Sequence, residues 1–312
     1  MTHLARYFPL PSLAACHAFW TPVVPCRMAS MARVALSFAA LVWSLQWLFQ
    51  GPRWLADGGP LELATVSQLL GFEATMSWTD SVAAMRPSLL VALTSPTAIT
   101  AYAVASAIGC LLVLLGIGGR AIVAVTWVML LGWSHRVAGL TGPGEDLLVG
   151  LFPYLLLDPG KIDSRWRPAF SDEGSRWTSG LAVRCLQVHL ALWMATTALS
   201  HASGLVWWQG ESVWWMASAG RSIGVDAPSL LSRTYLGNFL SHLWWLSLLV
   251  ACIGWMLPKV RGWSWIGWLT YGAGLGLFAG DWFYGLVAWF TSVLISPWMV
   301  VEDQQEACAK MR

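Results

Sequence analysis

Six ionisable side chains stand near the same ends of the apolar segments in this sequence. They are His135, Glu145, Asp146, His201, His242 and Asp281. An imidazole titrates near physiological pH and can take up and release a proton, and a neighbouring carboxylate can assist it. We therefore predict a polar cavity for proton transfer, in which His201 is the catalytic base and Glu145, Asp146 and His242 assist.

Each of these residues also has a purely structural interpretation. A histidine at a helix end commonly donates a hydrogen bond to a backbone carbonyl. Glu145 and Asp146 follow the turn Gly142-Pro143-Gly144 and can cap the helix that begins there, and Asp281 can cap another. The histidines show no metal-binding spacing such as HExxH, so no metal site is predicted.

The segment that ends at His201 is long enough to cross a bilayer. At about 1.5 Å per residue, residues 180–201 span the roughly 30 Å of a hydrocarbon core. His189 then lies near the middle of the membrane and His201 at one interface. Inserting an ionisable group into a bilayer costs about 3 kcal/mol or more, so both imidazoles need partners or a water-filled cavity. A hydrogen bond to a neighbouring helix is the structural alternative for His189.

The composition is that of a membrane protein. Charged residues make up 11% of the chain and apolar residues 57%, and the mean hydropathy is +0.59. The net charge of +2 comes from scattered basic residues, which excludes nucleic acid as a partner. Six cysteines without a CxxC motif indicate neither a disulfide framework nor a zinc site. Many of the 23 tryptophans are expected at the two membrane interfaces.

Apolar runs predict an all-α fold, a polytopic integral membrane helical bundle with about eight transmembrane helices. The predicted crossings are residues 31–49, 97–116, 121–139, 146–157, 180–201, 236–257, 263–279 and 282–298. Two interfacial amphipathic helices are predicted within residues 61–78 and 211–219. Residues 31–300 form the transmembrane domain, and residues 1–30, which lack a signal-peptide pattern, and 301–312 are predicted cytoplasmic tails.

The basic residues test this topology. With a cytoplasmic amino terminus, five of the 18 Lys and Arg residues lie outside, namely Arg53, Arg86, Arg136, Arg221 and Arg233. The other thirteen lie inside, which satisfies the positive-inside rule. Both termini are then cytoplasmic, and the six polar residues above all face the extracytoplasmic side. We find no internal repeat that would favour an inverted-repeat transporter.

Three stretches carry a resemblance to a known family. LQVHLALWMATTALSHASGLVWWQG, residues 186–210, resembles the signature of the HTTM family, the membrane module shared with vitamin K-dependent γ-glutamyl carboxylase. Gly204, Trp207 and Gly210 stand where that family has its Gly and W-x-x-G. Residues 144–165 and 276–298 are similar to two further family blocks, and the likeness covers most of residues 29–300.

The resemblance implies a function at the outer face of the membrane. It implies a cofactor site at Trp207, Trp208 and Gly210. The residues leave the cofactor open, and the family suggests a reduced quinone such as vitamin K. His201 stands where the carboxylase has a Lys base. Since the chain ends soon after its last predicted crossing, we expect no large extracytoplasmic domain, which argues against glutamate carboxylation. Short bacterial Sdp-type members, implied in maturation of secreted peptide toxins, resemble this chain in length and imply the bacterial inner membrane.

Three functions follow, in decreasing order of support. The first is a membrane enzyme, carboxylase-like or quinone-linked, that handles a lipid quinone or a secreted peptide at the outer cavity. The second is a non-catalytic partner that holds a secreted peptide precursor or another membrane protein for maturation or export. The third, a channel or transporter, rests on the buried histidines alone. The lipid bilayer is a partner in all three.

Overall fold

The computed structural model describes residues 20, 26–62, 65, 88, 90, 93–136, 141–158, 177–218, 234–256 and 260–295. In these parts of the chain every regular element is a helix. The elements that matter for the site are α2 (Cys26–Leu55), α5 (Pro96–Leu114), α6 (Gly119–Arg136), α7 (Pro143–Leu151), η3 (Phe152–Leu156), α8 (Trp177–Ser203), α9 (Leu205–Trp208), α10 (Ser212–Met216), α12 (Thr234–Met256), α13 (Arg261–Leu277), α14 (Trp282–Thr291) and η6 (Ser292–Ile295). The predicted all-α fold is confirmed at this level.

Four helices in the described part are long and apolar enough to cross a membrane. They are α2, α5, α8 and α12. Each lies over a predicted crossing, and their lengths of 19 to 30 residues correspond to about 28–45 Å of helix. These helices are what an integral membrane protein requires. Helix α2 begins at Cys26, so it starts inside the stretch predicted as an amino-terminal tail.

The other four predicted crossings coincide with helices that fall short of these criteria. Helix α6 has 18 residues, with Arg120 and Arg136 near its two ends, and α13 has 17. Helix α7 has 9 residues before the 3₁₀ turn η3, and α14 has 10 before η6. With these turns, the helical segments cover residues 143–156 and 282–295, about 23 Å each, which is less than the roughly 30 Å of a hydrocarbon core. The eight-crossing topology therefore stays a prediction.

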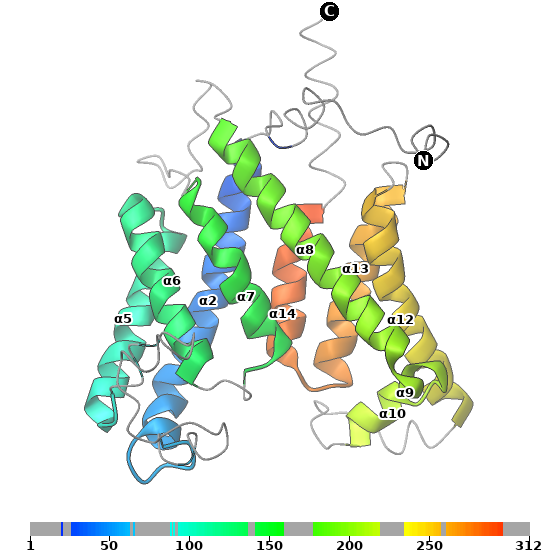
Figure 1. Cartoon of the computed structure of the whole chain (residues 1–312), viewed down its shortest axis with the longest axis horizontal. Helices are drawn as coiled ribbons and strands as arrows, with labels where there is room; N and C mark the ends of the chain where they lie inside the picture. Colours follow the sequence, from blue (N-terminus) through cyan, green and yellow to red (C-terminus); the bar gives the residue numbers. More distant parts are fainter. Residues whose placement is uncertain are drawn as a thin grey trace, which may run out of the picture.

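The long elements run alternately up and down through the bundle (Figure 1). Helix α2 begins and η6 ends at the same end of the bundle, while α9, α10 and the α13–α14 connection lie at the opposite end. We call this opposite end the α9 end. The start of α7 also lies there, so residues far apart in the sequence meet at one level.

Aromatic side chains fill the core between the helices. Trp43, Trp133 and Trp268 are fully buried. The ring of Trp133 stacks on that of Trp47 at a centroid distance of 5.2 Å, which joins α6 to α2. Such pairs add about 0.5–1.5 kcal/mol beyond the area that they bury. Buried aromatic rings thus join helices that are far apart in the sequence.

The structure describes only one of the two regions predicted to form surface helices. Most of residues 61–78 lie outside the described residues. In the second region the structure has the short helix α10, with Trp214 and Trp215 exposed. The carboxyl-terminal tail, residues 301–312, also lies outside the described part.

Candidate functional site

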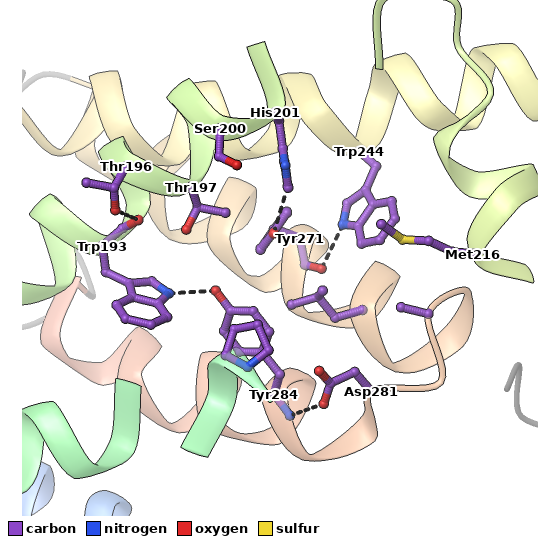
Figure 2. A pocket seen from close by; sticks show the side chains of 13 residues that line it. Trp193, Thr196, Thr197, Ser200, His201, Met216, Trp244, Tyr271, Asp281 and Tyr284 are labelled. Carbon is purple, nitrogen blue, oxygen red and sulfur yellow. Dashed lines mark hydrogen bonds between the residues drawn. The ribbon is translucent and has the colours of Figure 1, made fainter. Parts of the chain in front are cut away.

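A cavity of about 470 Å³ opens near the α9 end, between α7, α8, α10, α12, α13 and α14. Figure 2 shows how its side chains converge from these helices. Its lining consists of Pro143, Trp193, Thr196, Thr197, Ser200, His201, Met216, Trp244, Tyr271, Leu275, Ala279, Asp281 and Tyr284. Asp281 and His201 are the acidic and the basic residue of this wall, which is otherwise uncharged. We call the cavity the outer cavity because the predicted topology puts this end of the bundle outside.

One face of α8 supplies much of the wall. Trp193, Thr197, Ser200 and His201 follow one another at spacings of four, three and one residues, which places them on one side of a helix with 3.6 residues per turn. Leu199, between them in sequence, is 70% exposed and points away from the cavity. Helix α8 therefore presents a polar and aromatic stripe to the cavity and an apolar one to its surroundings.

His201 is held on two sides. Its Nε2 atom lies 3.1 Å from the hydroxyl oxygen of Tyr271 on α13. Its ring stacks on Trp207, with centroids 3.8 Å apart and an interplanar angle of 19°. The stack forms because α8 ends just after His201 and the chain turns at Gly204, where the Gly204 N–H donates to the His201 carbonyl. The imidazole is thus fixed in orientation at the cavity wall.

Tyr271 is positioned in turn by Trp244. The Trp244 Nε1–H donates to the Tyr271 carbonyl oxygen at 3.0 Å, and the two rings lie 5.7 Å apart. The close approach of α12 to α13 depends on Gly274, where a Cβ atom would lie 2.6 Å from the Trp244 Nε1. Both Tyr271 and Trp244 are almost fully buried, so their geometry is set by packing.

A second hydroxyl belongs to Tyr284, near the start of α14. It accepts a hydrogen bond of 2.7 Å from the Trp193 Nε1–H, and its ring lies edge-on to Tyr271 at 6.3 Å. Asp281 caps α14 by accepting from the Tyr284 N–H at 3.0 Å, as its predicted capping role requires. Asp281 also lines the outer cavity, so capping and the predicted place in the polar cluster coexist.

Glu145 reaches this end of the site from α7. A Cβ atom at Gly144 would lie 2.6 Å from the Tyr284 Cα, so the glycine lets α7 pack directly on the start of α14. The Glu145 Oε2 and Asp281 Oδ2 atoms lie 3.0 and 3.2 Å from the position that a Gly142 Cβ would occupy. Two carboxylates from different helices therefore meet beside the cavity.

The surroundings of Glu145 disfavour its charged form. Burial raises the pKa of this carboxyl from 4.5 to about 7, partly offset by hydrogen bonds from backbone N–H groups and reinforced by the negative charge of Asp281. Its Oε2 atom is buried and has no hydrogen-bond partner. Glu145 lies outside the four helices that can span a membrane. It is a carboxyl that exchanges a proton near neutral pH.

The structure separates the other predicted catalytic residues from the outer cavity. Asp146 is exposed, and its Oδ1 accepts from the Ser134 hydroxyl at 3.2 Å. His242 is exposed on α12, and its Nε2 lies 3.1 Å from where a Gly210 Cβ would be. Neither side chain lines the outer cavity, and Glu145 lies beside it without lining it, so His201 is the predicted catalytic residue that the cavity contains. In the described part of the chain no three His, Cys, Asp or Glu residues are grouped to hold a metal ion.

Only one of the three residues predicted to bind a cofactor packs against the outer cavity. Trp207 is 9% exposed and forms the back of the site through its stack on His201. Trp208 is 56% exposed and packs on Trp245, with its Nε1–H donating to the Ala202 carbonyl. Gly210 has a φ of +73°, so it makes the turn between α9 and α10. Of the three, Trp207 is the residue that supports the cavity.

Sequence reasoning missed the aromatic half of the site. Trp193 and Trp244 were covered only by the general expectation that tryptophans lie at the membrane interfaces, and no role was predicted for Tyr271 or Tyr284. Trp193 shares the helical face of His201, and that spacing was a usable signal. The two tyrosines lie in separate predicted crossings, and nothing in the sequence joins them to α8.

His189 lies with Tyr154 in a second, smaller cavity of about 280 Å³, which adjoins the outer cavity since Trp193 and Thr196 line both. Its Nδ1 atom is 3.2 Å from the Tyr154 hydroxyl, so the predicted hydrogen bond to a neighbouring helix is present. A Cβ atom at Gly150 would lie 3.0 Å from the His189 Nε2, so the imidazole packs closely on α7. The imidazole of His189 therefore has a hydrogen-bond partner, and it does not line the outer cavity.

Comparison with protein families, with curated proteins and with solved structures finds no match for this chain. The likeness to the HTTM family therefore stays a prediction.

Proposed function

We propose that this chain is an HTTM-like integral membrane enzyme that binds the ring of a reduced lipid quinone in the outer cavity and removes a proton from it, with His201 as the base. The observation that carries this proposal is the hydrogen-bonded pair of His201 and Tyr271 in the wall of a 470 Å³ cavity. A neutral imidazole so placed can accept a proton from a ligand hydroxyl.

The residues present fit such a ring. Small-molecule sites typically enclose about 300–1,000 Å³ with mostly apolar walls and a few polar groups. Trp193 and Trp244 offer aromatic faces, while the hydroxyls of Thr197, Tyr271 and Tyr284 offer hydrogen bonds (Figure 2). A hydroquinone needs both, because its ring is apolar and its two oxygens are polar. Bound in this cavity, it would supply an acidic hydroxyl.

The location of the cavity supports an outward-facing site. The cavity lies near the α9 end, opposite the end where α2 begins (Figure 1). With the amino terminus in the cytoplasm, as the basic residues predict, eight alternating crossings would place the α9 end outside a bacterial inner membrane. Both termini are then cytoplasmic, and a lipid quinone would reach the cavity from the outer leaflet.

A binding measurement tests the proposal. Purified protein in lipid nanodiscs is titrated with menadiol and menadione, and bound ligand is measured by equilibrium dialysis. Thr197→Trp fills the cavity and is expected to weaken binding at least tenfold, whereas Leu199→Trp adds the same side chain on the opposite, exposed face and is expected to leave it unchanged. Equal loss in both variants, or no saturable binding by the unmodified protein, would refute the proposal.

The role of His201 is tested separately. In His201→Ala menadiol is still expected to bind under anaerobic conditions, because the aromatic walls remain, but it is expected to stay protonated at a pH at which the unmodified protein holds its anion, as followed by absorbance. An unchanged pH titration of the bound menadiol would remove His201 from the mechanism. Saturable capture of a secreted peptide without any quinone binding would instead favour the non-catalytic partner.

A further inference from the structure

We propose that Asp281 makes the outer cavity selective for the reduced form of its ligand, because its carboxylate accepts a hydrogen bond from the ligand hydroxyl that lies away from His201. This inference rests on the proposed function, since it assigns the residue that distinguishes a hydroquinone from a quinone in the same cavity.

Asp281 and His201 are the ionisable groups of the cavity wall that a ligand can reach. Both side chains are half-buried and line the cavity. The tyrosines of the wall are far less accessible, since Tyr271 is 1% exposed and Tyr284 is 2% exposed. In Figure 2 Asp281 and His201 lie on opposite sides of the lining, with both tyrosines between them. A ring whose two oxygens point in opposite directions can therefore direct one oxygen toward each group.

The carboxylate of Asp281 is held in place by the turn between α13 and α14. The chain turns at Gly280, whose φ is +63°, and Asp281 then caps α14. Its Oδ1 accepts from the Tyr284 N–H at 3.0 Å, and its backbone N–H donates to the Leu275 carbonyl at 3.1 Å. An ionised carboxylate accepts several hydrogen bonds and donates none, so one capping bond does not exhaust its capacity to accept.

The neighbouring charges make this end of the cavity negative. Glu145 faces Asp281 from α7, and the two carboxyl groups interact through their charges. None of the residues that line the cavity, all of them in the described part of the chain, is a lysine or an arginine. A ligand hydroxyl that donates a hydrogen bond is therefore favoured here, whereas a ligand oxygen that only accepts is disfavoured.

This preference matches the chemical difference between the two forms of the ligand. Each oxygen of a hydroquinone carries a proton and can donate it in a hydrogen bond, whereas each oxygen of a quinone is a carbonyl that only accepts. Against Asp281 the hydroquinone forms a charge-assisted hydrogen bond, and the quinone brings a partial negative charge toward the carboxylate. A neutral imidazole has one nitrogen that donates and one that accepts, so His201 does not distinguish the two forms in this way.

The selectivity is measured by equilibrium dialysis of protein in lipid nanodiscs. Menadiol is kept reduced with dithionite under argon, menadione is titrated in air, and the pH is one at which free menadiol is neutral. The unmodified protein is expected to bind menadiol at least about tenfold more tightly than menadione, the effect of one charge-assisted hydrogen bond. Menadione is still expected to saturate the cavity, because its ring meets the same aromatic walls.

Asp281→Asn tests the carboxylate without removing the cap. Asparagine caps a helix as well as aspartate does, but its amide can also donate a hydrogen bond to a carbonyl. We expect this variant to bind menadiol more weakly and menadione more tightly, so that the ratio of the two dissociation constants falls about tenfold. The control is Asp146→Asn, which removes an exposed carboxylate of α7 that does not line the cavity and is expected to keep the preference for menadiol.

Three results would overturn the inference. Equal affinity of the unmodified protein for menadiol and menadione would show that the cavity is not selective. An unchanged ratio in Asp281→Asn, including an equal loss of affinity for both ligands, would leave Asp281 with the cap of α14 as its role. If the unmodified protein binds neither ligand, the proposed function fails, and the selectivity fails with it.

Discussion

Replacing Glu145 with glutamine is expected to make the folded protein more stable in alkaline solution. Burial raises the pKa of Glu145 from 4.5 to about 7, so the folded chain holds a proton that the unfolded chain has already released between these two values. Stability contributed by this group is therefore full below pH 4.5, falls as the pH rises to 7, and stays low above that.

The gain in stability follows from the rise in the pKa of Glu145. At 1.36 kcal/mol per unit of pKa, the rise from 4.5 to about 7 corresponds to about 3 kcal/mol of unfolding free energy. Because the side chain is partly exposed, solvent screening reduces this value, and about 1–3 kcal/mol is expected. Glutamine fills the same space and never ionises, so Glu145→Gln does not lose this unfolding free energy at alkaline pH.

The assay is thermal unfolding in detergent micelles at about pH 4 and about pH 8, followed by circular dichroism. Glu145→Gln should match the unmodified protein at the lower pH and melt later at the higher one. The control is Asp146→Asn, which removes a carboxylate from the same helical turn at an exposed position. Equal melting of Glu145→Gln and the unmodified protein at both pH values would show that the fold does not raise the pKa of Glu145, and the reasoning would be refuted.

Three other predictions concern the contacts that build the site. Gly144→Ala places a Cβ atom 2.6 Å from the Tyr284 Cα and should lower the unfolding free energy by about 1–3 kcal/mol. The control is Gly262→Ala, whose Cβ would have no atom within 4 Å and which should leave the unfolding free energy unchanged. Thermal melts compare the two variants. Asp281→Ala removes the α14 cap and should cost about 0.5–2 kcal/mol in the same assay, while Asp281→Asn retains most of it. Trp207→Leu removes the ring that holds His201 and should reduce the deprotonation of bound menadiol, followed by absorbance against pH, more than it weakens menadiol binding.

The sequence was sufficient to predict the helices, because apolar runs of 20 residues have few alternatives to a membrane helix. Predicted boundaries for α5, α8 and α12 agree with the structure to within about three residues. Helix α7 and the 3₁₀ turn η3 together cover residues 143–156, beside the predicted 146–157, and Pro153 stands at the change from one to the other. Helix α14 and η6 cover residues 282–295, and the end of the predicted segment 282–298 lies outside the described residues.

Only the contacts of the candidate site between residues that are close in the sequence could be predicted. His201 and Trp207 are neighbours in sequence, so their proximity could be anticipated, and Asp281 was placed correctly at a turn. The meeting of His201 with Tyr271 depends on how α8 crosses α13, which a single sequence does not encode in any spacing. His242 faces outward for the same reason, since the rotation of α12 is set by packing at Gly274.

The central claim is that an outward-facing cavity beside His201 accepts a quinone ring. Its most direct test places a single cysteine at Ser200, which is exposed and lines the cavity, in a cysteine-free background. A membrane-impermeant maleimide is applied to intact cells with and without menadione, and Leu199→Cys serves as the control. We predict that Ser200→Cys is labelled from outside and protected by menadione, while Leu199→Cys is not protected. Labelling of Ser200→Cys only from the cytoplasmic side, or without any protection, would contradict the account.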